Sequence, residues 1–357
     1  MNRVRTINFV FFATVLLSLV GNFINQWIFN YTDNYFIILL VSQIILVLPS
    51  AIYLALSKNS IGKAIRFNKI KGSNIVLIII FSYLISPLMT LINAISMLFV
   101  KNDTAGLMEN IVTNNGFIIS LFIIAFIPCV LEETVYRGIF YNEYRKVSPI
   151  KGILLSAFLF GIMHMNFNQF SYAFIMGIIF ALLIEATDSI LSTMIVHFFI
   201  NGNSVLIMFL YPKMMEYLEK VYGSGYFNSA ETIEGIQANF QMDFSLVLRT
   251  YAFPALVGSV LAFIVYRAIA KNSGRWTFIK GLFKPGGNME VSSFQDTGEN
   301  NLSYQQKKRL MTASLLIGIL VCVTLMIWGE IISQMPSPSI NEVNNTSLSI
   351  YINHILS

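Results

Sequence analysis

The sequence carries unusually little charge. Only 11% of its 357 residues are charged, whereas 55% are hydrophobic. Soluble globular proteins have about 25% charged residues. A deficit of this size excludes most soluble classes and predicts a chain whose main solvent is a lipid bilayer.

Cysteine and several nucleotide and metal motifs are also scarce or missing. The two cysteines, Cys129 and Cys322, lie inside apolar runs, which is typical of buried small hydrophobes and argues against a disulfide framework. There is no G-x-x-x-x-G-K phosphate loop and no H-E-x-x-H motif. Although the net charge is +5, the basic residues lie in short loops between apolar runs, so we expect no nucleic-acid partner.

Nine apolar runs approach the roughly 20 residues that a helix needs to cross the hydrocarbon. They cover residues 7–29, 35–57, 74–100, 116–141, 152–167, 170–186, 189–211, 248–270 and 310–332. The fifth and sixth runs are short and separated only by Asn168 and Gln169, so either they form a tight hairpin or one of them spans incompletely. This pattern predicts an all-α membrane protein, a multi-pass bundle of about eight to nine transmembrane helices.

The basic residues give this bundle an orientation. If the N-terminus is cytoplasmic and every run spans, 19 of the 23 basic residues fall on the cytoplasmic side. The four on the other side are Lys101, Lys213, Lys220 and Arg249. Because Lys and Arg favour cytoplasmic loops, we expect a cytoplasmic N-terminus and an extracytoplasmic C-terminal tail.

The runs divide the chain into four parts. These are N-terminal transmembrane helices in 1–115, a core in 116–211, an extracytoplasmic loop in 212–247, and C-terminal transmembrane helices in 248–357 with a cytoplasmic loop at 271–309 and a tail. Within the loop 212–247, Lys213–Tyr222 and Ser229–Gln241 are candidates for short surface helices.

Three charged residues stand inside the fourth run, namely Glu132, Glu133 and Arg137. One charged side chain in the bilayer interior costs at least about 2.5–3.5 kcal/mol, so this group needs a structural or a chemical reason. Glu133 and Arg137 are four residues apart, which predicts an ion pair along one helix face with a mainly structural role.

Further polar residues lie on neighbouring runs. His164 is near the end of the fifth run, and His197 and Asn201 share a helix face in the seventh. At about 1.5 Å per residue, Glu132, His164, His197 and Asn201 fall roughly 12–18 Å from the cytoplasmic ends of their helices. Each of these side chains, taken alone, could serve only to make an interhelical hydrogen bond. Four such groups in one layer favour a functional site.

This set of side chains supports hydrolysis. A carboxylate in a cavity of low dielectric can act as a general base on water, helped by an imidazole. A second imidazole and an amide can donate to a developing oxyanion. Glu132, His164 and His197 could alternatively bind zinc with one position open for water. The spacing does not choose between the two.

With these residues in hand, the chain resembles the CPBP family of intramembrane proteases. That family includes the type II CAAX prenyl endopeptidases and the bacterial Abi and bacteriocin-processing or immunity proteins. Its pattern of E-E-x-x-x-R, F-x-x-x-H and H-x-x-x-N stands here as Glu132 to Arg137, Phe160 to His164 and His197 to Asn201. The resemblance covers about residues 116–211, which it marks as a catalytic CPBP/Abi-like core.

The resemblance implies roles for each motif residue. Glu132 would activate the water with His164 beside it, and His197 with Asn201 would form the oxyanion side. Glu133 and Arg137 would support the site. Members are described both as zinc enzymes and as glutamate-dependent enzymes, so zinc stays open. In the family the site is reached from the cytoplasmic side through a membrane cavity.

These observations predict an intramembrane endopeptidase that acts on a peptide or membrane-protein substrate in a bacterial cell membrane. One rival is a toxin self-immunity protein of the same fold that does not cleave. Another is a proton-coupled transporter that uses Glu132 and the histidines as a relay. Against the transporter, the sequence has no inverted repeat and no paired broken helices.

Overall fold

The structure is a computed structural model that describes residues 3–32, 35–57, 60–102, 104–222, 244–283 and 310–334. Its helices are α1 Arg3–Phe29, α2 Tyr35–Leu56, α3 Ile61–Ala64, α4 Gly72–Ser96, α5 Thr104–Ser120, η1 Leu121–Phe126, α6 Ile127–Glu133, η2 Thr134–Tyr141, α7 Asn142–Tyr144, α8 Pro149–Ile162, α9 Phe167–Thr187, α10 Leu191–Tyr222, α12 Phe244–Val247, η3 Leu248–Ala252, α13 Phe253–Asn272, α14 Trp276–Leu282 and α15 Ala313–Ser333. The elements marked η are π-helical. These ranges contain no β-strand.

Eight helical segments are long and apolar enough to cross a membrane. The expected all-α, multi-pass bundle is therefore confirmed, and the chain is an integral membrane protein. Large apolar side chains cover its outside; Phe23, Phe253 and Leu320 are each at least 65% exposed. Lipid tails are the solvent that such an apolar surface requires.

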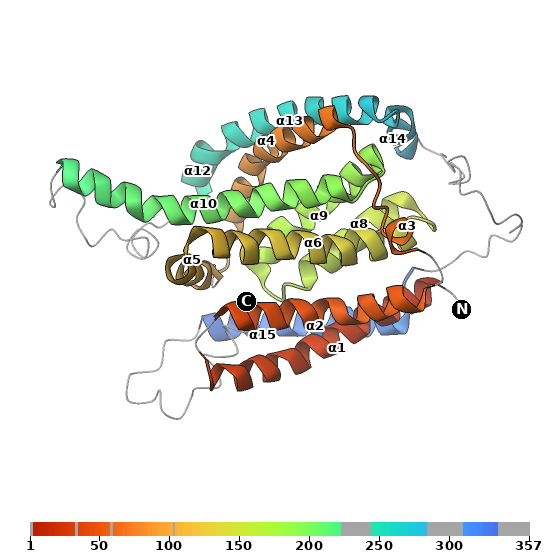
Figure 1. Cartoon of the computed structure of the whole chain (residues 1–357), viewed down its shortest axis with the longest axis horizontal. Helices are drawn as coiled ribbons and strands as arrows, with labels where there is room; N and C mark the ends of the chain where they lie inside the picture. Colours follow the sequence, from red (N-terminus) through yellow and green to blue (C-terminus); the bar gives the residue numbers. More distant parts are fainter. Residues whose placement is uncertain are drawn as a thin grey trace, which may run out of the picture.

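The helices form two groups that lie side by side (Figure 1). α1 packs against both α2 and α15, while α4 and α13 pair at the opposite edge with α10 and α6 between. Small residues allow the closest approaches. A Cβ on Gly258 of α13 would lie 2.5 Å from the Leu84 carbonyl oxygen of α4, and one on Gly177 of α9 would lie 2.7 Å from Ala157 Cα of α8. Close backbone contact of this kind holds membrane helices together.

The bundle has two distinct ends. One, here the arginine end, holds the N-terminus together with α3 and α14, and the other, here the distal end, holds α5 and α12 (Figure 1). Asn8, near the start of α1, accepts a hydrogen bond from the Tyr144 hydroxyl at 2.7 Å. Because α1 has 27 residues, its last residue, Phe29, lies about 30 Å further along the bundle, at the distal end.

Helices α8 and α9 form a hairpin. α8 has 14 residues, about 21 Å, and is too short to cross the hydrocarbon. The expected separator Asn168–Gln169 is wrong, because the turn lies at residues 163–166 and both residues belong to α9. Asn166 caps α9 by accepting from the Gln169 backbone N–H at 3.0 Å. The hairpin turn therefore lies at membrane depth.

A long helical segment from Thr104 to Tyr144 carries the adjacent glutamates Glu132 and Glu133. It bends at Gly116, whose φ of 72° breaks the helix where the fourth apolar run was expected to begin. From there η1, α6 and η2 follow without interruption. π-helical turns inside α-helices are frequent at functional sites.

One loop boundary differs from expectation. α10 continues to Tyr222, so Lys213–Tyr222 is its last part and no separate surface helix, although Pro212 stands within it. Ser229–Gln241, most of the loop 271–309 and the tail beyond Gln334 lie outside the described residues.

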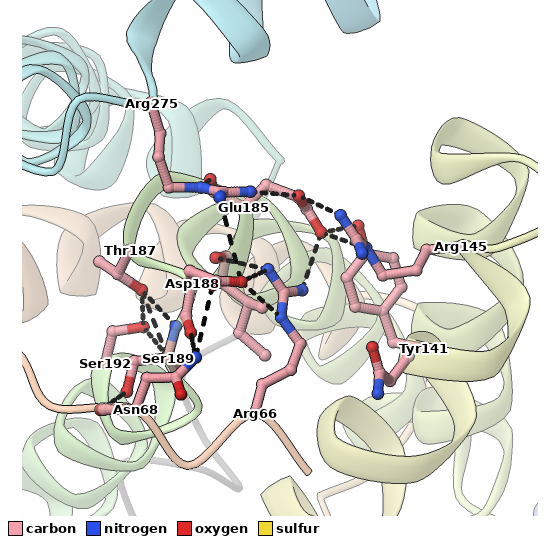
Figure 2. A network of polar contacts seen from close by, with 12 residues as sticks. Arg66, Asn68, Tyr141, Arg145, Glu185, Thr187, Asp188, Ser189, Ser192 and Arg275 are labelled. Carbon is pink, nitrogen blue, oxygen red and sulfur yellow. Dashed lines mark hydrogen bonds and ion pairs between the residues drawn. The ribbon is translucent and has the colours of Figure 1, made fainter. Parts of the chain in front are cut away.

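The arginine end is held by a cluster around Glu185, a fully buried residue of α9 (Figure 2). Its carboxylate accepts from Arg145 at 2.7 and 2.9 Å, from Arg66 at 2.9 Å, from Arg275 at 3.1 Å and from the Tyr141 hydroxyl at 2.9 Å. These partners come from the segment after α3, from η2 and the turn after α7, and from the α13–α14 turn. One carboxylate thus ties four segments together.

Asp188 adds a second carboxylate to this cluster by accepting from the Arg66 guanidinium. Burial by itself lowers the pKa of Arg66, but the carboxylates of Glu185 and Asp188 outweigh it and leave that pKa above its ordinary value. Burial lowers the pKa of Arg275. Three cations and two carboxylates are an arrangement in which each buried charge has a partner.

Candidate active site

Glu133 is the structural centre of the site. Its Oε1 atom accepts from Arg137 Nη1 at 3.0 Å and lies 3.0 Å from His197 Nδ1. All three side chains are at most 2% exposed. The expected i, i+4 ion pair is confirmed, and it also fixes an imidazole from a different helix.

The bond to Glu133 sets the tautomer of His197. A carboxylate can only accept, so Nδ1 carries the proton. In the neutral ring Nε2 is then an acceptor, and it becomes a donor only when the ring is doubly protonated. His197 Nε2 lies 4.0 Å from Glu132 Oε2. Two acceptors at this distance can each take one O–H of a single water at about 2.8 Å.

Glu132 precedes Glu133 at the end of α6, but its side chain lies in a different environment. Its side chain is 13% exposed, and its Oε1 accepts from Gln43 Nε2 of α2 at 3.3 Å. The carboxylate therefore reaches the open part of the site, whereas Glu133 is enclosed.

His164 occupies the α8–α9 turn. Its Nδ1 lies 2.9 Å from the Phe160 carbonyl oxygen, so Nδ1 donates and Nε2 is left as the second nitrogen. In the described part of the chain no hydrogen bond or ion pair joins His164 to Glu132. The next residue, Met165, has a positive φ of 50°, a strained conformation of the kind found at functional sites.

Phe160 is the packing centre for the charged groups. Its ring centroid is 4.0 Å from Arg137 Cζ, 5.1 Å from the His164 ring and 6.3 Å from the His197 ring. The buried guanidinium of Arg137 over the ring face gains electrostatic stabilisation. One phenylalanine thus positions members of all three sequence motifs.

Asn201 lies one helical turn beyond His197. Its Nδ2 donates to the Ile124 carbonyl oxygen of η1 at 3.0 Å. A carboxamide nitrogen has two N–H groups, so the second remains for a ligand.

These residues share one cavity of about 650 Å³. Glu132, His164, His197 and Asn201 all line it, as does Phe160. Glu133 and Arg137 are not among its lining residues, which fits their place behind the imidazole. The structure therefore brings the four residues predicted to share a depth to one space inside the bundle.

The described residues contain no preformed set of zinc ligands. Across the described ranges, no group of three or more His, Cys, Asp or Glu side chains could hold a metal ion. Two of the proposed ligand atoms, His197 Nε2 and Glu132 Oε2, lie 4.0 Å apart, and no hydrogen bond or ion pair joins His164 to Glu132 in the described ranges. The donors as placed do not fit a zinc site.

Sequence reasoning missed Gln43 and Tyr136. Gln43 binds Glu132, and Tyr136 lines the cavity with a buried hydroxyl that has no hydrogen-bond partner within the described ranges. The sequence could have indicated Gln43, because it is the only carboxamide in the apolar run 35–57. Polar residues in a membrane span are costly and therefore often functional.

A comparison with protein families matches the same segment. The family model described as type II CAAX prenyl endopeptidase Rce1-like covers residues 114–202. Residues 114–202 form an Rce1-like domain. This confirms the resemblance to the CPBP family and supports, at the general level, a protease of the CAAX-protease type. The comparisons with curated proteins and with solved structures gave no match. The Rce1-like domain contains every motif residue, from Glu132 to Asn201.

Proposed function

We propose that the chain is an intramembrane endopeptidase, in a bacterial cell membrane, that hydrolyses a peptide bond of a membrane-associated protein or peptide with a water activated by Glu132. The observation that carries this proposal is that Glu132, His164, His197 and Asn201 line one cavity inside the bundle of apolar helices. The Rce1-like domain supports the same reaction class.

The geometry suggests a separate role in the reaction for each of these side chains. Glu132 Oε2 and His197 Nε2 hold the water through its two O–H groups, which turns its lone pairs toward a substrate carbonyl. Glu132 takes one proton as the oxygen attacks the carbonyl carbon. The free N–H of Asn201 donates to the oxyanion of the tetrahedral intermediate. The proton that Glu132 has taken from the water then passes to the nitrogen of the leaving amine, directly or through Nε2 of His164, which lines the same cavity, so that Glu132 and His164 return to their starting states.

This assignment differs from the one that the resemblance implies. There His164 accompanies Glu132 and His197 serves the oxyanion. In the structure the imidazole within 4.0 Å of Glu132 is that of His197, and its Nδ1 is already committed to Glu133. A neutral His197 in this tautomer accepts at Nε2, which suits a water better than an oxyanion.

The test is proteolysis by the purified protein in nanodiscs, with a pool of synthetic peptides and mass spectrometry of the products. We expect Glu132→Gln to lower kcat about 10²–10⁴-fold, the usual contribution of a general base, with unchanged folding. Glu109→Gln, on α5 and outside the cavity lining, is the matched control. Full activity of a folded Glu132→Gln protein would refute the role of Glu132. If the chain protects cells from a peptide toxin and Glu132→Gln still protects, the immunity function is the better one.

A further inference from the structure

The carboxylate of Glu132 is held by a residue from outside the Rce1-like domain. Gln43 lies on α2, in the same group of helices as α1 and α15, whereas Glu132 lies on α6 in the other group (Figure 1). The 3.3 Å hydrogen bond from Gln43 Nε2 to Glu132 Oε1 therefore crosses between the two groups. Because the matched domain covers residues 114–202, Gln43 belongs to a part of the chain to which the family comparison assigns nothing.

Stability alone does not explain a carboxamide at position 43. In α2, 11% of the most apolar stretch is buried, against 22% or more in the other seven spanning segments, so this helix has little packing to offset a costly polar side chain. Gln43 Oε1 is buried and has no hydrogen-bond partner within the described ranges, which costs further free energy. An apolar residue would avoid both costs. The N–H that Gln43 directs at Glu132 is therefore the better reason for its presence.

A contact with α1 sets the rotation of α2 about its axis. Ser42 Oγ accepts from Asn25 Nδ2 of α1 at 2.7 Å, and Asn25 is only 5% exposed. On the other side of Gln43, Ile44 is 55% exposed. Successive residues lie about 100° apart around a helix. With Ser42 bound to α1 and Ile44 facing outward, Gln43 is left facing α6 and lines the cavity.

The two oxygens of Glu132 have separate partners. Oε1 accepts from Gln43, while Oε2 lies 4.0 Å from His197 Nε2, with the proposed water between them. A glutamate side chain has several rotatable bonds, so a carboxylate without a partner on Oε1 can turn away from that water. A displacement of about 1 Å at a reacting group can cost about 10²-fold in rate. An amide suits this place because it donates an N–H without itself acting as a base.

We propose, building on the peptidase function above, that Gln43 is a positioning residue for Glu132 and that α2 is part of the active site. The N–H of Gln43 keeps the carboxylate turned toward the water that it deprotonates. Gln43 contacts neither that water nor the substrate carbonyl, and acts through Glu132 alone. The Rce1-like domain supplies the reacting groups, and a helix from outside that domain holds the general base in place.

The first test is kinetic and uses the purified full chain in nanodiscs. Gln43→Met keeps the length of the side chain and removes the donor, and Gln43→Leu does the same with a shorter side chain. We expect kcat to fall about 10–10²-fold, with KM unchanged because Gln43 does not contact the substrate. Ile44→Met is the matched control, since it places the same residue on the outward face of the same helix, and should change neither constant. A folded Gln43→Met protein with full kcat would overturn the inference.

The second test reads the contact without any cleavage. In protein labelled with ¹³C at the glutamate side-chain carboxyl groups, the NMR signal of Glu132 is the one that Glu132→Gln removes. We expect Gln43→Met to shift this signal, because the carboxylate loses a hydrogen-bond donor, and Ile44→Met to leave it in place. An unmoved signal in Gln43→Met would show that Gln43 does not hold Glu132, and would overturn the inference whatever the kinetic result.

The two measurements separate the positioning role from the peptidase function. A lower kcat, an unchanged KM and a shifted Glu132 signal in Gln43→Met support the inference. A raised KM with unchanged kcat would make Gln43 a substrate-binding residue instead, and would overturn the positioning role. If the unmodified chain cleaves no peptide while Gln43→Met still shifts the Glu132 signal, the peptidase function is refuted and the hold of Gln43 on Glu132 stands.

Discussion

The imidazole of His197 is anchored to Glu133, with Nδ1 3.0 Å from Oε1. The same oxygen accepts from Arg137, so a single carboxylate atom fixes a cation on its own helix and an imidazole on another. The second glutamate of the motif is thus a positioning group, and the first is free to face the cavity.

Removing the charge of Glu133 should destabilise the bundle. Glu133→Gln leaves the guanidinium of Arg137 buried without a carboxylate, and breaking a buried pair in this way costs about 3–5 kcal/mol. The unfolding midpoint in detergent measures the loss. The double variant Glu133→Gln/Arg137→Met removes both charges and should recover part of the stability. A double variant less stable than Glu133→Gln would show that the pair is not coupled as described.

Phe160 should matter for activity more than its size alone predicts. Phe160→Ala removes the ring that contacts Arg137, His164 and His197, and loosening the two imidazoles should lower kcat at least about 10²-fold. The matched control is Phe158→Ala on the same helix, whose ring contacts Phe170 and Phe174 instead. Both variants lose packing, so equal kcat values for the two would contradict the positioning role of Phe160.

Glu185 should be the most sensitive carboxylate of the arginine end. Glu185→Gln leaves Arg66, Arg145 and Arg275 without their shared partner, and we expect a loss of about 3–5 kcal/mol in the free energy of unfolding. Glu216→Gln breaks an ion pair with Lys220 whose two side chains are 64% and 71% exposed, and should change nothing measurable. Equal midpoints in thermal unfolding for the two variants would show that the Glu185 cluster does not hold the end of the bundle.

Metal removal should leave proteolysis intact. The described residues provide no group of three or more His, Cys, Asp or Glu with metal-binding geometry, so the proposed reaction depends on the carboxylate of Glu132. We expect unchanged kcat after dialysis against a strong chelator, with the metal content measured by mass spectrometry. Activity that disappears on chelation and returns only with added zinc would replace the carboxylate mechanism.

The sequence alone determined the features that depend on local geometry. The long apolar runs predict the spanning helices because a helix must satisfy its own backbone in lipid. The Glu133–Arg137 pair follows from the i, i+4 spacing on one helix. The three motifs could be placed at one depth because the rise per residue is fixed.

Only the tertiary structure decided how the helices face one another. The rotation and shift of each helix about its axis place His197, and not His164, within 4.0 Å of Glu132. The same packing gathers three arginines from distant segments around Glu185. It also gathers carboxamide side chains from several helices around one cavity. Helical periodicity does not fix these angles, because many rotations bury a predominantly apolar helix in a membrane equally well.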